Sequence, residues 1–241
     1  MAKDSRVGGK RQKGHAAHNL IYQQLKEALM NGDFLPGQRL IVRELAERFK
    51  TSPMPVRQAL QRLTSENALV DHLNRGVLVP EASIEAISDL ARVRCLIEGG
   101  AAEWAATTVT TEEIEELAKI NAAMLRAAKT QGGAKNYLVL NRRFHFSIYG
   151  AARSPALLAT IERFWLRAGP WLNIMRQGAM IGLGLDHHDA VIEAFKRGDG
   201  GMARRAVAAD ISDAADILMR AATTPPDAKP PVRRKGVTMP A

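Results

Sequence analysis

The sequence predicts a mainly α-helical protein in two parts, an N-terminal winged helix-turn-helix and a C-terminal all-helical bundle. Three observations predict it. Three short segments with helical apolar spacing occupy the first 66 residues, and two strand-like segments follow them. From residue 84 to about 221, apolar residues recur at helical spacing almost without a break. With 241 residues and 46% hydrophobic side chains, the chain can bury a core in each part.

The first helix is expected from about His15 to Asn31, and Gly32 is expected to end it in the left-handed conformation. Its apolar stripe consists of Ile21, Leu25, Ala28 and Leu29. A turn at residues 35–37 (LPG) then leads into a short second helix over residues 42–49. The two helices together bring the chain to the start of the third.

Ser52 is expected to be the N-cap of a third helix, and Pro53 suits its first position. Its buried stripe is predicted to consist of Val56, Ala59, Leu60 and Leu63, and its opposite face of Met54, Arg57, Gln58 and Gln61. Asn67 is expected to end this helix, at the position after the C-terminus that glycine usually occupies. Strands are expected at 68–72 and 77–79, with a turn at 73–76 (LNRG) between them.

The remaining chain is predicted to be helical in six segments: 84–107, 111–130, 135–151, 155–177, 180–197 and 199–221. Thr110 and Glu113 have the spacing of a capping box at the start of the second of these. We therefore expect a disordered basic arm (1–14), a winged helix-turn-helix domain (15–80), a helical domain (84–221) and a disordered basic tail (222–241).

The positive charge is concentrated at the front of the chain. Residues 1–80 hold 13 lysines and arginines against 7 acidic residues, whereas residues 81–221 hold 17 of each. This asymmetry favours a polyanion as the partner of the front domain. The single cysteine, Cys95, excludes a disulfide scaffold and suits a reducing cytoplasm. No apolar run approaches the roughly 20 residues that a membrane span needs.

A helix-turn-helix places the polar face of its third helix in the major groove of a duplex. Arg57 and Gln61 lie one turn apart and project from that face. Arg75, at the tip of the wing, is positioned to reach the minor groove or the backbone. Arg43, at the start of the second helix, is positioned to contact a phosphate. The alternative is that these arginines are only solvated surface.

Residues 20–80 resemble the GntR family of bacterial transcription regulators without a gap. The resemblance rests on Gly32, residues 35–37, Leu40, residues 45–46, Phe49, Ser52, residues 55–60, Leu63, residues 69–70, residues 74–76 and Val79. It implies operator contacts by Arg43, Ser52, Arg57, Arg75 and Gly76, beside Met54 and Gln61 on the same surface. Many relatives carry arginine directly after the serine, where this chain has Pro53.

Residues 84–215 resemble the FCD effector domain of the FadR-type subgroup. The resembling segments are Arg94-x-x-x-Glu98, Asn141-x-x-Phe144-His145, Ser154-Pro155-x-Leu157 and His188-x-x-x-Ile192 up to Asp199. In relatives, one aspartate and three histidines hold a divalent cation. The resemblance implies the set Asn141, His145, His188 and Asp210 here, for a metal of the zinc, nickel or manganese class. The alternative is a metal-free pocket in which His145 and His188 are satisfied core histidines.

Two further positions in the helical part, His188 and Arg94, carry an expected role. A helix turns about 100° per residue, so His187 and His188 cannot both face the core squarely. The resemblance to the FCD domain implies that His188 faces inward and His187 outward. Arg94 is a candidate for pairing with a ligand carboxylate, and an internal pair with Glu98 is the equally simple alternative.

Together these patterns predict a cytoplasmic, homodimeric, ligand-responsive transcription regulator, a repressor that binds a palindromic operator and senses a small organic acid. A helical metalloenzyme with a two-histidine, one-carboxylate site is the alternative from another class, although an enzyme has no need for a winged helix. A constitutive architectural DNA-binding protein is a third hypothesis, but it leaves Arg94 and the two histidines without a purpose.

Overall fold

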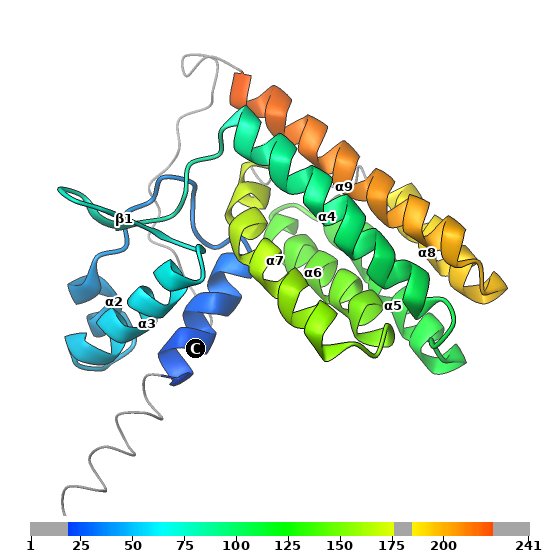
Figure 1. The fold of residues 1–241 in the computed structure, drawn as a ribbon, viewed down its shortest axis with the longest axis horizontal. Coiled ribbons are helices and arrows are strands. Elements are labelled where there is room, and N and C mark those ends of the chain that lie inside the picture. Colours follow the sequence, from blue (N-terminus) through cyan, green and yellow to red (C-terminus); the bar gives the residue numbers. More distant parts are fainter. Residues whose placement is uncertain (1–18, 176–184, 224–241) are drawn as a thin grey trace, which may run out of the picture.

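The computed structural model describes residues 19–175 and 185–223, which form a small head against a helical bundle (Figure 1). The predicted arm at 1–14 and nearly all of the predicted tail at 222–241 lie outside these residues. So do residues 176–184, which include the end of the helix expected at 155–177 and the start of the one expected at 180–197.

The head is a winged helix-turn-helix, as the sequence predicts. A helix described over residues 19–30 is followed by α2 (Val42–Arg48), α3 (Pro53–Ser65), β1 (Val70–His72) and β2 (Gly76–Leu78). The strands pair antiparallel, with Val70 opposite Leu78 and His72 opposite Gly76. The apolar stripe expected on α3 is buried, so the opposite face of this helix is turned to solvent.

Helix ends in the head follow the predicted local chemistry with one exception. Gly32 and Asn67 both adopt positive φ, +67° and +57°, as expected after a helix C-terminus. Ser52 occupies the N-cap of α3, but its side chain makes no capping hydrogen bond. Pro55 stands at the third helical position and has no N–H, so one of the two backbone donors open to an N-cap side chain is absent. The Ser52 hydroxyl is therefore left exposed at the start of the helix.

The bundle contains α4 (Ile84–Ala105), α5 (Thr111–Lys129), α6 (Ala134–Ala151), α7 (Pro155–Met175), α8 (Leu185–Arg197) and α9 (Gly200–Thr223). The long helices α4 and α9 run side by side along one flank (Figure 1). The capping box of Thr110 and Glu113 is present. None of the helices in the described segments has both the length and the mean hydropathy needed to cross a bilayer.

The head docks onto the bundle through the helix over residues 19–30. Gly169 on α7 lies directly against the end of this helix, and the Asn173 side chain donates a hydrogen bond to the Gly32 carbonyl. An ion pair of 2.7 Å joins the Lys26 ammonium to the Glu162 carboxylate. A glycine at position 169 lets two helix backbones approach closely, so α7 is a bundle helix against which the head packs directly.

We expect Gly169→Ala to loosen this contact. A Cβ at position 169 would lie 2.8 Å from Met30 Cα and closer still to the Leu29 carbonyl oxygen, and neither backbone atom can move aside cheaply. Overpacking of this kind costs about 1–3 kcal/mol of unfolding free energy. Calorimetry should show either a lower unfolding temperature than in the wild type or two separate unfolding transitions.

Gly150→Ala is the matched control for Gly169→Ala. Gly150 is also helical, but nothing lies within 4 Å of its added Cβ, so the substitution should stabilise the chain by roughly 0.5–1 kcal/mol. Equal effects of the two substitutions would contradict the interdomain role of Gly169.

Candidate functional site

The exposed face of α3 carries the side chains that the sequence assigned to recognition. Arg57 and Gln61 are exposed, and in the described part of the chain neither makes a side-chain hydrogen bond or ion pair. Met54 is 61% exposed beside them. Arg43 on α2 projects into solvent, with only a loose 3.7 Å contact to Glu47. These side chains are therefore accessible from solvent.

The wing presents a second exposed feature. Arg75 is exposed in the turn between β1 and β2, and Gly76, with a φ of +70°, begins β2. Leu73, in the same turn, is fully exposed. The bridge between Arg39 and Leu78 ties the base of the wing to the chain ahead of α2. The wing thus holds a cationic tip away from the head.

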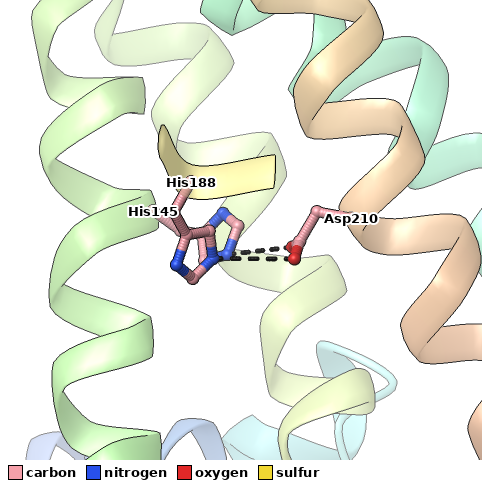
Figure 2. Close-up of side chains that lie close together, drawn as sticks. All are labelled: His145, His188 and Asp210. Atoms are coloured by element: carbon pink, nitrogen blue, oxygen red, sulfur yellow. Dashed lines mark ion pairs between the residues drawn. The ribbon is translucent and has the colours of Figure 1, made fainter. Parts of the chain in front are cut away.

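Inside the bundle, three side chains from three helices converge (Figure 2): His145 of α6, His188 of α8 and Asp210 of α9. His145 Nε2 lies 3.2 Å from Asp210 Oδ2, and His188 Nε2 lies 3.5 Å from Asp210 Oδ1. All three potential ligand atoms lie within 4.8 Å of one another. Both imidazoles are almost completely buried.

Each imidazole has a partner on its other nitrogen. His188 Nδ1 lies 3.2 Å from Asn121 Oδ1, and Asn121 Nδ2 donates to Asp189 Oδ1 at 2.7 Å. His145 Nδ1 lies 3.1 Å from the Tyr149 hydroxyl. Such outer contacts fix the orientation of histidine ligands in metal sites. Both Nε2 atoms therefore face Asp210.

A buried glutamate organises the neighbouring core. Glu98 of α4 has no exposed surface and receives hydrogen bonds from Tyr149 at 2.5 Å and from Trp165 Nε1 at 3.1 Å. Arg94 pairs with it through Nε at 2.6 Å and Nη2 at 3.2 Å. The Glu98 charge is thus compensated inside the protein, and a ligand carboxylate at Arg94 would have to share the guanidinium with Glu98.

Burial and charge set the protonation states of the converging residues. Burial lowers the pKa of His188 to about 4. Burial would raise the pKa of Asp210, but the hydrogen bond with His145 and the nearby imidazoles outweigh it and lower that pKa to about 2. At neutral pH, Asp210 is an anion and His188 is a neutral ring, which are the forms that bind a metal ion.

One buried atom tests whether this set fits a cation. His188 Nε2 is buried and, among the described atoms, has no hydrogen-bond partner. Buried polar atoms without a partner are rare and costly. A divalent cation between this nitrogen, His145 Nε2 and the Asp210 carboxylate would satisfy it, and two imidazoles with one carboxylate suit zinc, nickel or manganese.

The structure brings together three of the four metal ligands that the sequence suggested. Asn141 is half-buried on α6, one turn before His145, and within the described residues its side chain makes no hydrogen bond. His188 faces inward as predicted, while His187 is half-exposed and pairs with Asp213 at 2.7 Å. The assignments of Asn141 and Arg94 stay predictions.

Sequence reasoning missed Asn121 and its role beside His188. A signal was present, because Asn121 is a polar residue within an otherwise apolar stripe of α5 that includes Leu117, Ile120 and Met124. A buried polar residue is the informative exception in such a stripe. The sequence could not show that Asn121 contacts His188, since the two residues lie 67 positions apart in the chain.

Comparison with known proteins gives two family matches. The family described as "Bacterial regulatory proteins, gntR family" matches residues 18–79, and the FCD domain matches residues 89–213. The chain is 34% identical over 155 residues to the HTH-type transcriptional regulator McbR of Escherichia coli (strain K12), covering 64% of this chain and 70% of that protein.

A second relative and a solved structure agree with these matches. The Nta operon transcriptional regulator of Aminobacter aminovorans is 31% identical over 142 residues, which cover 58% of this chain and 67% of the relative. The structure of E. coli McbR/YncC superposes with a TM-score of 0.78 at 28% identity, covering 85% of this chain and 97% of that one.

Proposed function

The chain belongs to the GntR family of bacterial transcription regulators and combines its DNA-binding domain with an FCD domain, and from this premise we propose that it is a metal-dependent sensor of a small organic acid that binds a palindromic operator as a homodimer. The observation that carries the sensor half is the buried Nε2 of His188, which faces Asp210 and His145 and has no hydrogen-bond partner among the described residues.

The head is proposed to read DNA with the exposed face of α3. Arg57 and Gln61 would contact base edges in the major groove, beside Met54. The free Ser52 hydroxyl, the N-terminus of α3 and Arg43 would bind phosphates, and a cationic wing tip at Arg75 and Gly76 would enter the adjacent minor groove. Two copies would read two half-sites of a palindrome. A chromosomal operator as the partner supports a cytoplasmic location.

The bundle is proposed to hold a divalent cation on His145, His188 and Asp210, with Asn141 as the fourth ligand from the same face of α6. The cation would supply a positive centre with open coordination positions for a carboxylate. Arg94 is linked to this centre because it pairs with Glu98, which in turn accepts a hydrogen bond from Tyr149 beside His145. Its guanidinium would bind the same carboxylate. Asp210 alone would not neutralise a divalent ion, so an anionic effector is favoured.

We propose that effector binding changes operator affinity through α7. Trp165 on this helix bonds to Glu98 near the histidines, and Gly169 and Asn173, one and two turns further on, contact the head. An effector regulates only if it prefers one arrangement of the heads over another. Repression that the effector releases is the proposed outcome.

A thermal-shift screen tests the sensor. Small mono- and dicarboxylates are added to the full chain with zinc, nickel or manganese, and after chelation. We expect one class of acids to raise the melting temperature only with metal, because a ligand that binds the folded state stabilises it by mass action. Acids that act equally after chelation, or none acting at all, would contradict a metal-dependent sensor.

A further inference from the structure

A chain of polar contacts runs from the surface of α8 through α5 to the inner histidine. Asp189 is exposed, Asn121 is 7% exposed and His188 is 1% exposed. The amide nitrogen of Asn121 donates to Asp189 Oδ1 at 2.7 Å, and its amide oxygen lies 3.2 Å from His188 Nδ1. The contacts therefore link a solvent-facing carboxylate to a residue of the candidate metal site.

The chemistry of these groups fixes the direction of every hydrogen bond. An ionised carboxylate only accepts, so Asp189 requires the NH₂ side of the Asn121 amide. The amide oxygen is then the atom that faces His188, and an oxygen also only accepts. Nδ1 of His188 must therefore carry the proton. In a neutral ring the proton is then absent from Nε2, which leaves a lone pair at that nitrogen.

The other side of the ring shows what this tautomer does. His188 Nε2 lies 3.5 Å from Asp210 Oδ1 and makes no hydrogen bond within the described structure. If the contact served only packing, the opposite tautomer would donate from Nε2 to Asp210 and satisfy both atoms. Instead a lone pair faces a carboxylate, an arrangement that a cation between them stabilises.

We propose that Asn121, oriented by Asp189, is a positioning residue that holds His188 in its Nδ1–H tautomer and so aims the Nε2 lone pair at the metal site. This inference rests on the metal site of the proposed function. It adds that the metal-binding tautomer of His188 is already selected in the metal-free protein. The two residues that select it, Asn121 and Asp189, would not themselves bind the metal.

The first experiment observes the tautomer in the metal-free full chain at pH 8. Long-range ¹H–¹⁵N spectra of histidine-labelled protein show which ring nitrogen carries the proton, and a His188→Gln variant assigns the signal. We expect an Nδ1–H ring in the wild type. In Asp189→Asn, the new amide can donate or accept, so Asn121 can turn over and a population with Nε2–H should appear.

The second experiment measures zinc and nickel affinity of the same proteins by competition with a chelator. We expect a roughly tenfold loss in Asp189→Asn and up to about 100-fold in Asn121→Leu, the range for partners that orient a ligand. Asp186→Asn is the matched control, because Asp186 is also an exposed acid at the start of α8. It should change neither tautomer nor affinity.

Because Asp189 is exposed, its substitution tests the proposal even if Asn121→Leu fails to fold. An Nε2–H ring in the wild type overturns the inference, as does an Asp189→Asn variant with unchanged tautomer and zinc affinity within twofold. If the tautomer responds as expected but the wild type binds none of zinc, nickel and manganese, the positioning of His188 stands and the metal site of the proposed function fails.

Discussion

Arg57→Ala is expected to reduce binding of the preferred duplex to the level of non-specific DNA. Arg57 is the exposed arginine in the middle of the solvent face of α3. Within the described structure its side chain has no protein partner, so its removal should not disturb the fold. A bidentate contact to a base is worth about 1–3 kcal/mol per head, so a two-headed complex should weaken at least about 30-fold. Fluorescence anisotropy with a duplex selected from a random pool by the wild-type chain measures this loss.

Arg126→Ala is the control for that measurement. Arg126 is an exposed arginine on α5 in the bundle, so its removal deletes the same charge far from the head. It should leave the affinity nearly unchanged. Equal affinity of wild type and Arg57→Ala for the selected duplex would refute the assignment of α3 as the recognition helix. A fall that is uniform across all sequences would make Arg57 a phosphate contact instead.

Combined replacement of His145 and His188 by alanine is expected to abolish binding of divalent metal. These rings supply two of the three converging ligand atoms, and Asp210 alone is a weak site. In the wild type, zinc at 100 times its dissociation constant should stabilise the fold by about 2.7 kcal/mol, or roughly 5–10 °C in Tm. The double variant should show no such shift, and elemental analysis should find no metal.

His187→Ala is the matched control for the double replacement. His187 adjoins His188 but is half-exposed and pairs with Asp213, so its loss should not affect metal content. Asp210→Asn guards against misfolding of the double variant, because it keeps the shape of the side chain while removing the anionic ligand. A wild-type chain purified without chelators that contains no metal and gains no stability from zinc, nickel or manganese would refute the site.

Several features of the fold were predictable because they depend on neighbours along the chain. The capping box at Thr110 and Glu113 joins residues three apart, and the positive φ of Gly32 and Asn67 follows from helix termination. The 100° turn per residue predicts that only one of His187 and His188 faces the core, and the resemblance to the FCD domain indicated His188. The unused Ser52 cap shows the limit, since Ser52 holds the N-cap position without the side-chain hydrogen bond that its residue type predicts.

The candidate metal site was predictable only in part. Helical spacing places Asn141 and His145 on one face of α6, yet spacing cannot show which side chains on other helices meet them. The network of Glu98 with Tyr149 and Trp165 joins residues 51 and 67 positions apart. Its existence depends on how α4, α6 and α7 pack, because hydrogen-bond partners in a core are selected by distance in space.

By itself, the sequence determined the helices, the wing and the exposed face of α3, because local periodicity, caps and turn chemistry act over a few residues. The candidates His145, His188 and Asp210 came from the resemblance to the FCD domain. Tertiary structure alone decided that Arg94 pairs with Glu98, that Asn121 and Asp189 orient His188, and that Gly169 seats the head on α7. These contacts arise when separate helices exclude water from a shared core, where each buried polar atom must find its partner among residues distant in the chain.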